Sequence, residues 1–182
     1  EKGIIKMIAK LTKNDFDGIF ELIEKSFPTD EYRQKSGQRA LFSLPEYEVW
    51  GIKNAENELQ TDAFISLWRF EDFTYGEHFA VRRELRGQGT GTKILAEILQ
   101  NEHQRFCLEV ELPETEAAKR RIAFYERNGF TLNHFPYMQP PLGEDRDPLP
   151  LMIMTTGGAI EKDEFEHIRK TLYKKVYRSF SE

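Results

Sequence analysis

Cysteines able to form a disulfide and long hydrophobic runs are both missing from this sequence. Its 182 residues contain a single cysteine, Cys107, so no internal disulfide can form, which is typical of proteins in a reducing compartment. The two longest stretches without Asp, Glu, Lys or Arg, 128–143 and 148–160, cover 16 and 13 positions, and both contain prolines and glycines. A membrane-spanning helix needs about 20 apolar residues. We therefore predict a cytoplasmic protein that does not cross a membrane.

The sequence also has no surplus of positive charge. Its net charge is −5, which argues against a general nucleic-acid-binding protein, because neutralising phosphates requires a basic surface. An acidic chain is compatible with a cationic partner such as an amine. The apolar fraction of 39% and the 14 phenylalanines supply a core for one domain, since a domain of this size buries about 70% of the surface of its unfolded chain. We expect no metal cofactor.

The most informative stretch is 81–95, which reads V-R-R-E-L-R-G-Q-G-T-G-T-K-I-L. An apolar run that is typical of a strand ends at Val81, and the three alternating glycines Gly87, Gly89 and Gly91 follow it. An amphipathic helix is predicted directly behind them. Glycines ahead of a helix leave backbone N–H groups unobstructed beside the positive end of the helix dipole. This arrangement predicts a phosphate-binding turn.

The spacing of the glycines excludes two common phosphate loops. A dinucleotide-binding loop needs G-x-G-x-x-G, but Thr92 and Ile94 stand where the last glycine should be. A P-loop needs G-x-x-x-x-G-K-[ST], and Lys93 is preceded by Thr92 and followed by Ile94. The pattern that fits is R-x-x-G-x-G, formed by Arg86, Gly89 and Gly91.

A second motif follows at 117–130. Ala118, Ile122 and Tyr125 are spaced i, i+4, i+7 and predict one stripe of a helix. Asn128-Gly129 ends that helix, and the stretch closes as F-Y-E-R-N-G-F. The two motifs, in this order and separation, resemble the GNAT superfamily of acyl-CoA N-acyltransferases, whose signatures are V-x-x-x-x-[RQ]-G-x-G-x-[GA] and Y-E-[KR]-x-G-F.

The resemblance covers about residues 6–156 and implies an α/β fold with a mixed sheet, in the order β-α-α-β-β-β-α-β-α-β-β. Along the chain we expect a first strand over 3–11 and helices capped by Asn14 and Asp30. The predicted domain is 1–158, with an added C-terminal helical extension at 159–182. An apolar stripe on that extension predicts that it packs on the same domain or on a second copy of the chain, so a homodimer is one expected assembly.

The resemblance implies acetyl-CoA as the co-substrate. In the family the amides of the glycine turn hold the pyrophosphate, and the end of the preceding strand bonds the pantetheine through its backbone. The cofactor-binding residues are then Phe79, Ala80, Val81, Arg86, Gly87, Gln88, Gly89, Thr90, Gly91 and Thr92. Two positions depart from the family pattern: Ala118 replaces an asparagine that often contacts the pantetheine, and Arg121 replaces an alanine.

Acyl transfer to an amine requires a base and stabilisation of the leaving thiolate. Glu77 is the first candidate base, because many members carry an acid there; its alternative role is a solvated strand entrance. Glu111 is the second, because it shares one face of a predicted strand with Cys107 and Glu109, and acids on a buried strand suggest a cleft. Tyr125 is implied to protonate the thiolate, and its alternative role is core packing.

The acceptor is expected to lie beside 26–33 and 137–141, which both mix aromatic and polar residues. The predicted function is acetyl transfer to a primary amine of a small molecule or peptide, by direct attack in a ternary complex. The alternative is a CoA-binding sensor that has lost turnover, which the missing asparagine at position 118 favours.

Overall fold

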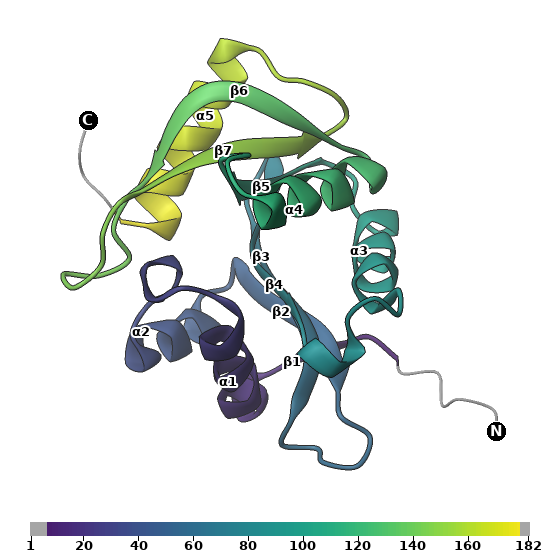
Figure 1. Ribbon diagram of the computed structural model, residues 1–182. Helices are drawn as coiled ribbons and strands as arrows, with labels where there is room; N and C mark the ends of the chain where they lie inside the picture. Colours follow the sequence, from purple (N-terminus) through teal and green to yellow (C-terminus); the bar gives the residue numbers. More distant parts are fainter. Residues whose placement is uncertain (1–6, 179–182) are drawn as a thin grey trace. The chain divides into compact units, whose positions relative to one another are not determined.

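The computed structural model describes residues 7–178, which form two compact units. The first unit comprises 7–28 and 34–104, and the second comprises 29–33 and 105–178. The described residues contain seven strands and five α-helices (Figure 1), and the predicted order of elements, including the added C-terminal helix, is confirmed. Part of the predicted first strand, at 3–6, and the end of the extension, at 179–182, lie outside the described residues. The division of the chain at residue 158 stays a prediction.

The first unit is an antiparallel sheet with helices on both faces. Its strands lie in the order β1-β2-β3-β4. α1 and α3 both contact β3 and β4, and they lie on opposite faces of the sheet in Figure 1. The bounds of its elements are β1 (Ala9–Leu11), α1 (Phe16–Ser26), α2 (Lys35–Ala40), β2 (Tyr47–Lys53), β3 (Thr61–Arg69), β4 (Phe73–Val81) and α3 (Thr90–Gln100).

Both predicted helix caps in the N-terminal part of the chain were wrong. Thr12, not Asn14, begins the first helical segment, because its backbone N–H donates to Asp15 Oδ2 at 2.8 Å and its hydroxyl accepts from the backbone in a capping box. Asp30 lies in a short 3-10 turn, while α2 begins only at Lys35. Local pattern locates a helix but not its first residue, since several polar residues nearby could each accept the orphan N–H groups.

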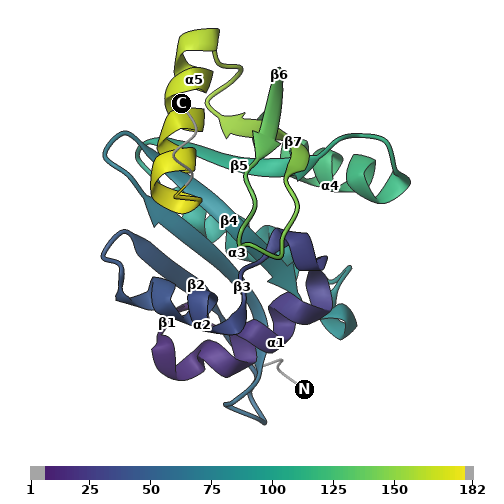
Figure 2. The same ribbon diagram turned by 90° about the vertical axis from the view of Figure 1, so that its left-hand side faces the viewer.

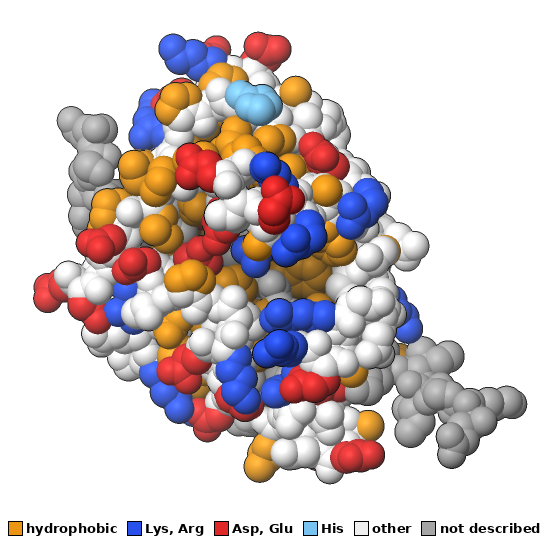
Figure 3. All heavy atoms as spheres, viewed as in Figure 1, with side chains coloured by type: hydrophobic (Ala, Val, Ile, Leu, Met, Phe, Trp, Pro, Cys, Tyr) orange, Lys and Arg blue, Asp and Glu red, His pale blue; other side chains and the backbone are white. Residues whose placement is uncertain are grey.

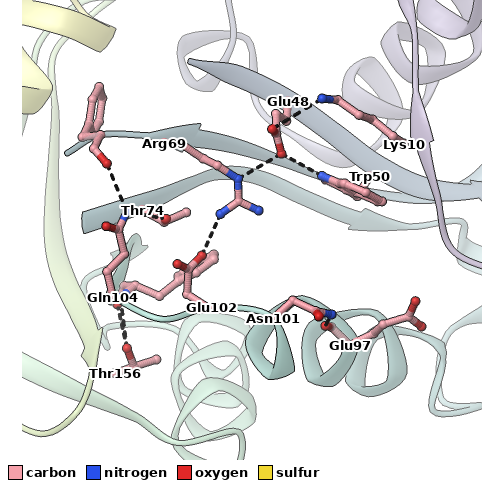
Figure 4. A network of polar contacts seen from close by, with 12 residues as sticks. Lys10, Glu48, Trp50, Arg69, Thr74, Glu97, Asn101, Glu102, Gln104 and Thr156 are labelled. Carbon is pink, nitrogen blue, oxygen red and sulfur yellow. Dashed lines mark hydrogen bonds and ion pairs between the residues drawn. The ribbon is translucent and has the colours of Figure 1, made fainter. Parts of the chain in front are cut away.

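A polar network joins the end of α3 to the sheet of the first unit (Figure 4). The guanidinium of Arg69 donates to Glu48 Oε2 at 3.0 Å and to Glu102 Oε2 at 2.9 Å. Glu48 also accepts from the Trp50 indole at 3.0 Å. Nearby, the side-chain amide of Gln104 donates to Phe70 O at 3.1 Å. These bonds fix the segment that follows α3 and thus the far end of the helix that carries the glycine turn.

The second unit is a three-stranded sheet in the order β5-β7-β6. Figure 2 shows α4 and α5 on opposite faces of these strands. Its elements are β5 (Arg105–Glu111), α4 (Glu116–Arg127), β6 (Phe130–Gln139), β7 (Leu149–Thr156), α5 (Lys162–Thr171) and a π-helical turn (Leu172–Val176). The extension is tied to the sheet at its start, where Ile160 N–H donates to Asn133 Oδ1 at 3.0 Å.

β6 separates from β7 in its middle. Asn133 pairs with Ile153 and Tyr137 pairs with Leu151, so three residues of β6 stand opposite Met152 alone. Phe135, one of these three, turns its ring to α5, where it stacks on Phe165 at a centroid distance of 4.7 Å. The separation therefore opens β6 toward the C-terminal extension.

Candidate functional site

The turn between β4 and α3 contains the predicted phosphate-binding glycines. Gly87 and Gly89 have φ angles of +75° and +79°, which glycine adopts without the steric cost that other residues meet. A Cβ atom built on either one would meet no atom within 4 Å. The surface of the turn is therefore open, and the backbone conformation is what requires glycine. Gly91 lies in the first turn of α3.

Backbone N–H groups at the start of α3 are available to an anion. Gly89 is the N-cap of the helix, and the first helical bond runs from Lys93 N–H to Gly89 O at 3.0 Å. The N–H groups of residues 90–92 therefore precede the helical ladder. They lie at the positive end of the helix dipole, which favours a negative charge.

Two polar side chains brace this turn from within. Arg86 Nε donates to Val81 O at 2.9 Å, and Gln88 Nε2 donates to Glu84 O at 3.0 Å. Figure 3 shows Lys and Arg side chains on the face of the first unit that carries the turn. The side chains of these two predicted cofactor residues therefore stabilise the shape of the turn. The hydrogen-bond donors that the turn offers to an anion are mainly its backbone N–H groups.

The last residues of β4 are placed by the neighbouring strand. Each residue of 79–81 pairs with one of 63–65 on β3. The side chain of Ala80 is buried, whereas Phe79 and Val81 are half-buried. The structure thus places the predicted pantetheine-binding segment directly before the glycine turn.

A β-bulge in β4 contains Glu77. Gly76 pairs with Leu67 and Phe79 pairs with Ile65, so Glu77 and His78 together stand opposite Ser66. Such an extra residue bends the strand and redirects its side chains. The Glu77 side chain is only 3% exposed and accepts from the Trp68 indole at 3.0 Å. The alternative prediction for Glu77, a solvated strand entrance, is therefore wrong.

Tyr125 lies on the buried face of α4. Thr115 caps this helix through a bond from Ala118 N–H at 3.1 Å. The ring of Tyr125 packs edge-on against Phe130, with centroids 5.6 Å apart. Burial raises the pKa of its phenol to about 12, although the nearby Arg121 acts in the opposite direction. Tyr125 therefore keeps its proton at neutral pH.

Glu109 on β5 is held by two phenols. Tyr137 donates to Glu109 Oε1 at 2.5 Å, and the hydroxyl of Tyr177 lies 2.7 Å from both carboxylate oxygens. Cys107, on the same face of the strand, is fully buried, and burial raises the pKa of its thiol. On the predicted acidic face of β5, Glu109 is therefore part of an internal hydrogen-bonded group, and Cys107 is inaccessible to solvent.

Glu111 forms a pair with Glu31, which belongs to the predicted acceptor segment 26–33 but was not among the predicted catalytic residues. Their side chains share a hydrogen bond, and Arg121 is a nearby cation. Burial, and then the charge of Glu111, raise the pKa of Glu31 to about 7. Two carboxyl groups in contact cannot both ionise easily, so they share a proton near neutral pH. Glu31 and Glu111 are far apart in the sequence, so no local pattern could have paired them.

Part of the first predicted acceptor segment, 29–33, contacts the loop between β6 and β7, which begins at the second acceptor segment. Arg146 Nε donates to Tyr32 O at 3.0 Å, and Asp147 N–H donates to Asp30 Oδ1 at 3.0 Å. Gln139 Nε2 also lies 3.5 Å from Asp30 O. The loop between β6 and β7 is therefore fastened to segment 29–33, the part of the first predicted acceptor segment that belongs to this unit.

A cavity of about 700 Å³ lies in the second unit, between β6, β7 and α5. Volumes of this size are typical of small-molecule pockets. Its lining is mostly apolar and aromatic, and it includes Tyr137 and Met138 of the second acceptor segment and Tyr173 and Arg169 of the C-terminal extension. The separation of β6 from β7 produces this space, because 134–136 line it too.

Two further properties of the described part concern metals and membranes. Within 7–178, no group of three or more His, Cys, Asp or Glu side chains is arranged to hold a metal ion. None of the helices in this range is both long enough and apolar enough to cross a bilayer.

Known proteins with similar sequences and structures share one kind of domain. The family model of the acetyltransferase (GNAT) domain matches residues 45–132. The structure of a GNAT-family protein from Bacteroides thetaiotaomicron is 35% identical in sequence and superposes with a TM-score of 0.84, over 94% of this chain and 98% of that one.

Two further proteins are less similar to this chain. YjbC of Bacillus subtilis (strain 168) is 25% identical over 113 residues, which are 61% of this chain and 55% of YjbC, so the match spans about half of that relative. Arabidopsis thaliana NAA60, solved in complex with acetyl-CoA, is 12% identical and has a TM-score of 0.64 over 82% of this chain and 96% of its own. The second likeness concerns the fold alone.

Proposed function

Because this chain belongs to the GNAT family of acetyltransferases, we propose that it transfers an acetyl group from acetyl-CoA to a primary amine of a small molecule or peptide, by direct attack in a ternary complex. The observation that carries this proposal is the glycine turn with its open surface and its amides ahead of the α3 ladder. Bound acetyl-CoA supplies an activated thioester, and the residues below bind, orient and exchange protons.

The turn fits the diphosphate of coenzyme A. Backbone N–H groups at 87–92 would hold it, because the positive φ angles of Gly87 and Gly89 leave that surface clear of side chains. Arg86 and Gln88 would support the turn through their bonds to backbone carbonyls. The backbone of 79–81 would align the pantetheine arm. No cationic side chain is required for the central contact, because the helix terminus itself favours an anion.

Tyr125 would stabilise the leaving thiolate by donating a hydrogen bond. Its pKa of about 12 lies well above that of a thiol, about 8.5, so complete proton transfer would be uphill by about 5 kcal/mol. A hydrogen bond from a neutral phenol carries no such penalty. Tyr125 is therefore proposed as a donor that keeps its proton, with water completing the protonation.

Glu111 is proposed as the general base together with Glu31. An alkyl ammonium with a pKa near 10.4 must lose its proton before it attacks, at a cost of about 4.6 kcal/mol at pH 7. The Glu31–Glu111 pair holds one proton near neutral pH, so one carboxylate remains able to accept another from a nearby water. Glu77 is the alternative base, although its burial and its bond to Trp68 limit its access to water.

A CoA-binding sensor is the second candidate function. Ala118, which replaces the asparagine common in the family, is 2% exposed and thus packs in the core. That position offers no side-chain contact to a pantetheine arm, which favours binding without efficient turnover.

One assay separates the two functions. Purified protein is incubated with acetyl-CoA and a panel of primary amines that includes small polyamines and peptides, and free thiol is measured with a disulfide reagent. An enzyme releases thiol only when an amine is present, whereas a sensor binds CoA in calorimetry and releases none. Absence of CoA binding would contradict both. Glu111→Gln and Glu77→Gln then identify the base, because only the variant that lacks it loses turnover.

A further inference from the structure

The C-terminal extension contacts both segments that are proposed to bind the acceptor. Arg33 donates to Val176 O at 3.2 Å, so the first segment holds the end of the π-helical turn. The hydroxyl of Tyr173 donates to Met138 O in the second segment. The hydroxyl of Tyr177 lies 3.5 Å from Gln139 Oε1. Two hydrogen bonds and one close polar contact thus connect the last described residues of the chain to the acceptor side of the second unit.

The backbone of the extension is shaped to place Tyr177. Its N–H donates to Leu172 O at 3.0 Å, an i→i+5 bond that closes the π-helical turn. Arg178, the next residue, has a φ of 51°, which is unusual for a residue other than glycine. π-helical turns and such backbone angles are concentrated at functional positions. Tyr177 lies between these two features and is 9% exposed.

Tyr177 reaches the centre of a buried polar group. Its hydroxyl lies 2.7 Å from each oxygen of Glu109, which also accepts from Tyr137 at 2.5 Å. Tyr137 in turn forms one wall of the cavity beside β6. Gln139, the other neighbour of Tyr177, reaches toward Asp30 O. The hydroxyl of Tyr177 thus bonds to Glu109, the partner of Tyr137 in the cavity wall, and lies beside the side chain of Gln139, which reaches the first acceptor segment.

We propose that Tyr177 is a positioning residue of the acceptor side, which fixes Glu109 and Gln139 and through them Tyr137 and segment 29–33. The C-terminal extension is then a functional part of the acceptor site. This inference rests on the proposed acetyl transfer. According to this proposal, the extension contributes to the binding of the amine and does not contribute to the binding of CoA.

The kinetic test uses Tyr177→Phe, which removes only the hydroxyl. Hydrogen bonds to charged groups are among the stronger ones, so we expect the KM for the best amine of the panel to rise about tenfold. The KM for acetyl-CoA is expected to stay within about twofold and kcat within about threefold. Thr171→Val is the matched control: it lies on the same extension, and its hydroxyl bonds only to His167 O. An unchanged amine KM, or equal changes in both KM values, would overturn the proposal.

A second variant separates positioning from general packing. Glu109→Gln should raise the amine KM similarly, and adding Tyr177→Phe to it should change little further, since both variants break the same link. Fully additive effects on the amine KM would contradict a shared role.

A third measurement does not depend on turnover. In Tyr177→Phe, hydrogen exchange is expected to accelerate at the amides of 29–33 and 137–139 and to stay unchanged in α4. Unchanged exchange in both segments overturns the positioning role. If the wild-type protein acetylates no amine, the proposed function fails, while this exchange experiment still decides whether Tyr177 organises these segments.

Discussion

At the scale of single residues, burial determines what each proposed catalytic group can do. Tyr125 has the position expected from its motif, but its surroundings raise the pKa of the phenol to about 12, which makes it a hydrogen-bond donor and a poor acid. The pKa of Glu31 is also raised, to about 7, which brings the loss of its proton into the physiological pH range. Neither property can be read from residue type alone.

Tyr125→Phe should therefore lower kcat by about 10²–10⁴-fold, because it removes the donor to the leaving thiolate and leaves the ring packing unchanged. The affinity for CoA, measured by calorimetry, should remain that of the wild type. A variant with normal turnover would remove Tyr125 from the mechanism.

Glu31 should also make stability depend on pH. Its pKa is raised from 4.5 to about 7 in the folded state, so the folded protein binds this proton more tightly than the unfolded chain does. The resulting stabilisation is complete below pH 4.5 and is lost as the pH rises through 7. Glu31→Gln, which mimics the protonated form, should match the wild type at pH 4.5 and exceed its free energy of unfolding at pH 8 by about 3 kcal/mol.

Urea unfolding at the two pH values measures this difference. Glu114→Gln, an exposed glutamate in the same unit, serves as the control and should follow the wild type at both. Equal destabilisation of Glu31→Gln at pH 4.5 and pH 8 would show that the proton is not shared.

At the scale of elements, the turn between β4 and α3 is the most important for the proposed binding of CoA. The anion-binding shape of the turn depends on the strand before it, on the two glycines with positive φ and on the helix behind it. Arg86 and Gln88 stabilise this shape through bonds to backbone carbonyls. The β-bulge at Glu77 is a second functional feature of β4, since it places a carboxylate beside Trp68.

Gly89→Ala should weaken CoA binding about tenfold. Its φ of +79° disfavours any residue with a Cβ atom by about 1 kcal/mol or more, so the turn would relax away from its anion-binding shape. Gly158→Ala is a control with matched backbone strain, because Gly158 has a φ of +94° and open space around it but lies in another loop. The CoA affinity of both variants is measured by calorimetry. If Gly89→Ala and Gly158→Ala bind CoA equally well, the turn does not bind the ligand.

At the scale of the whole molecule, binding of a co-substrate should stabilise the folded chain. A ligand that binds only the folded state adds RT ln(1 + [L]/Kd), which is about 2.7 kcal/mol at a hundredfold excess over Kd. CoA at that excess should therefore raise the unfolding temperature of the wild type. At the same concentration the gain should be smaller for Gly89→Ala. NAD, a diphosphate whose binding motif the turn lacks, should give no comparable shift.

Much of the fold was predictable because its signals are local. Strand and helix periodicity, the glycine spacing and the Y-E-R-N-G-F ending depend on neighbours in sequence, and the order of elements was correct. The two wrong caps, at Asn14 and Asp30, also arose locally, since Thr12 and Asp15 together satisfied the orphan N–H groups better than Asn14 alone. The candidate site was predicted less completely, because its polar partners come from distant segments.

The sequence by itself determined the family, the turn suited to a diphosphate and the identity of Tyr125 and Glu111 as candidates, because these depend on short spacings along the chain. Only the tertiary structure decided that Glu31 shares a proton with Glu111, that Glu77 is buried against Trp68, and that Tyr177 holds Glu109. The reason is physical: burial and the charge of neighbouring groups set the protonation and orientation of a side chain, and both arise only when remote segments pack together.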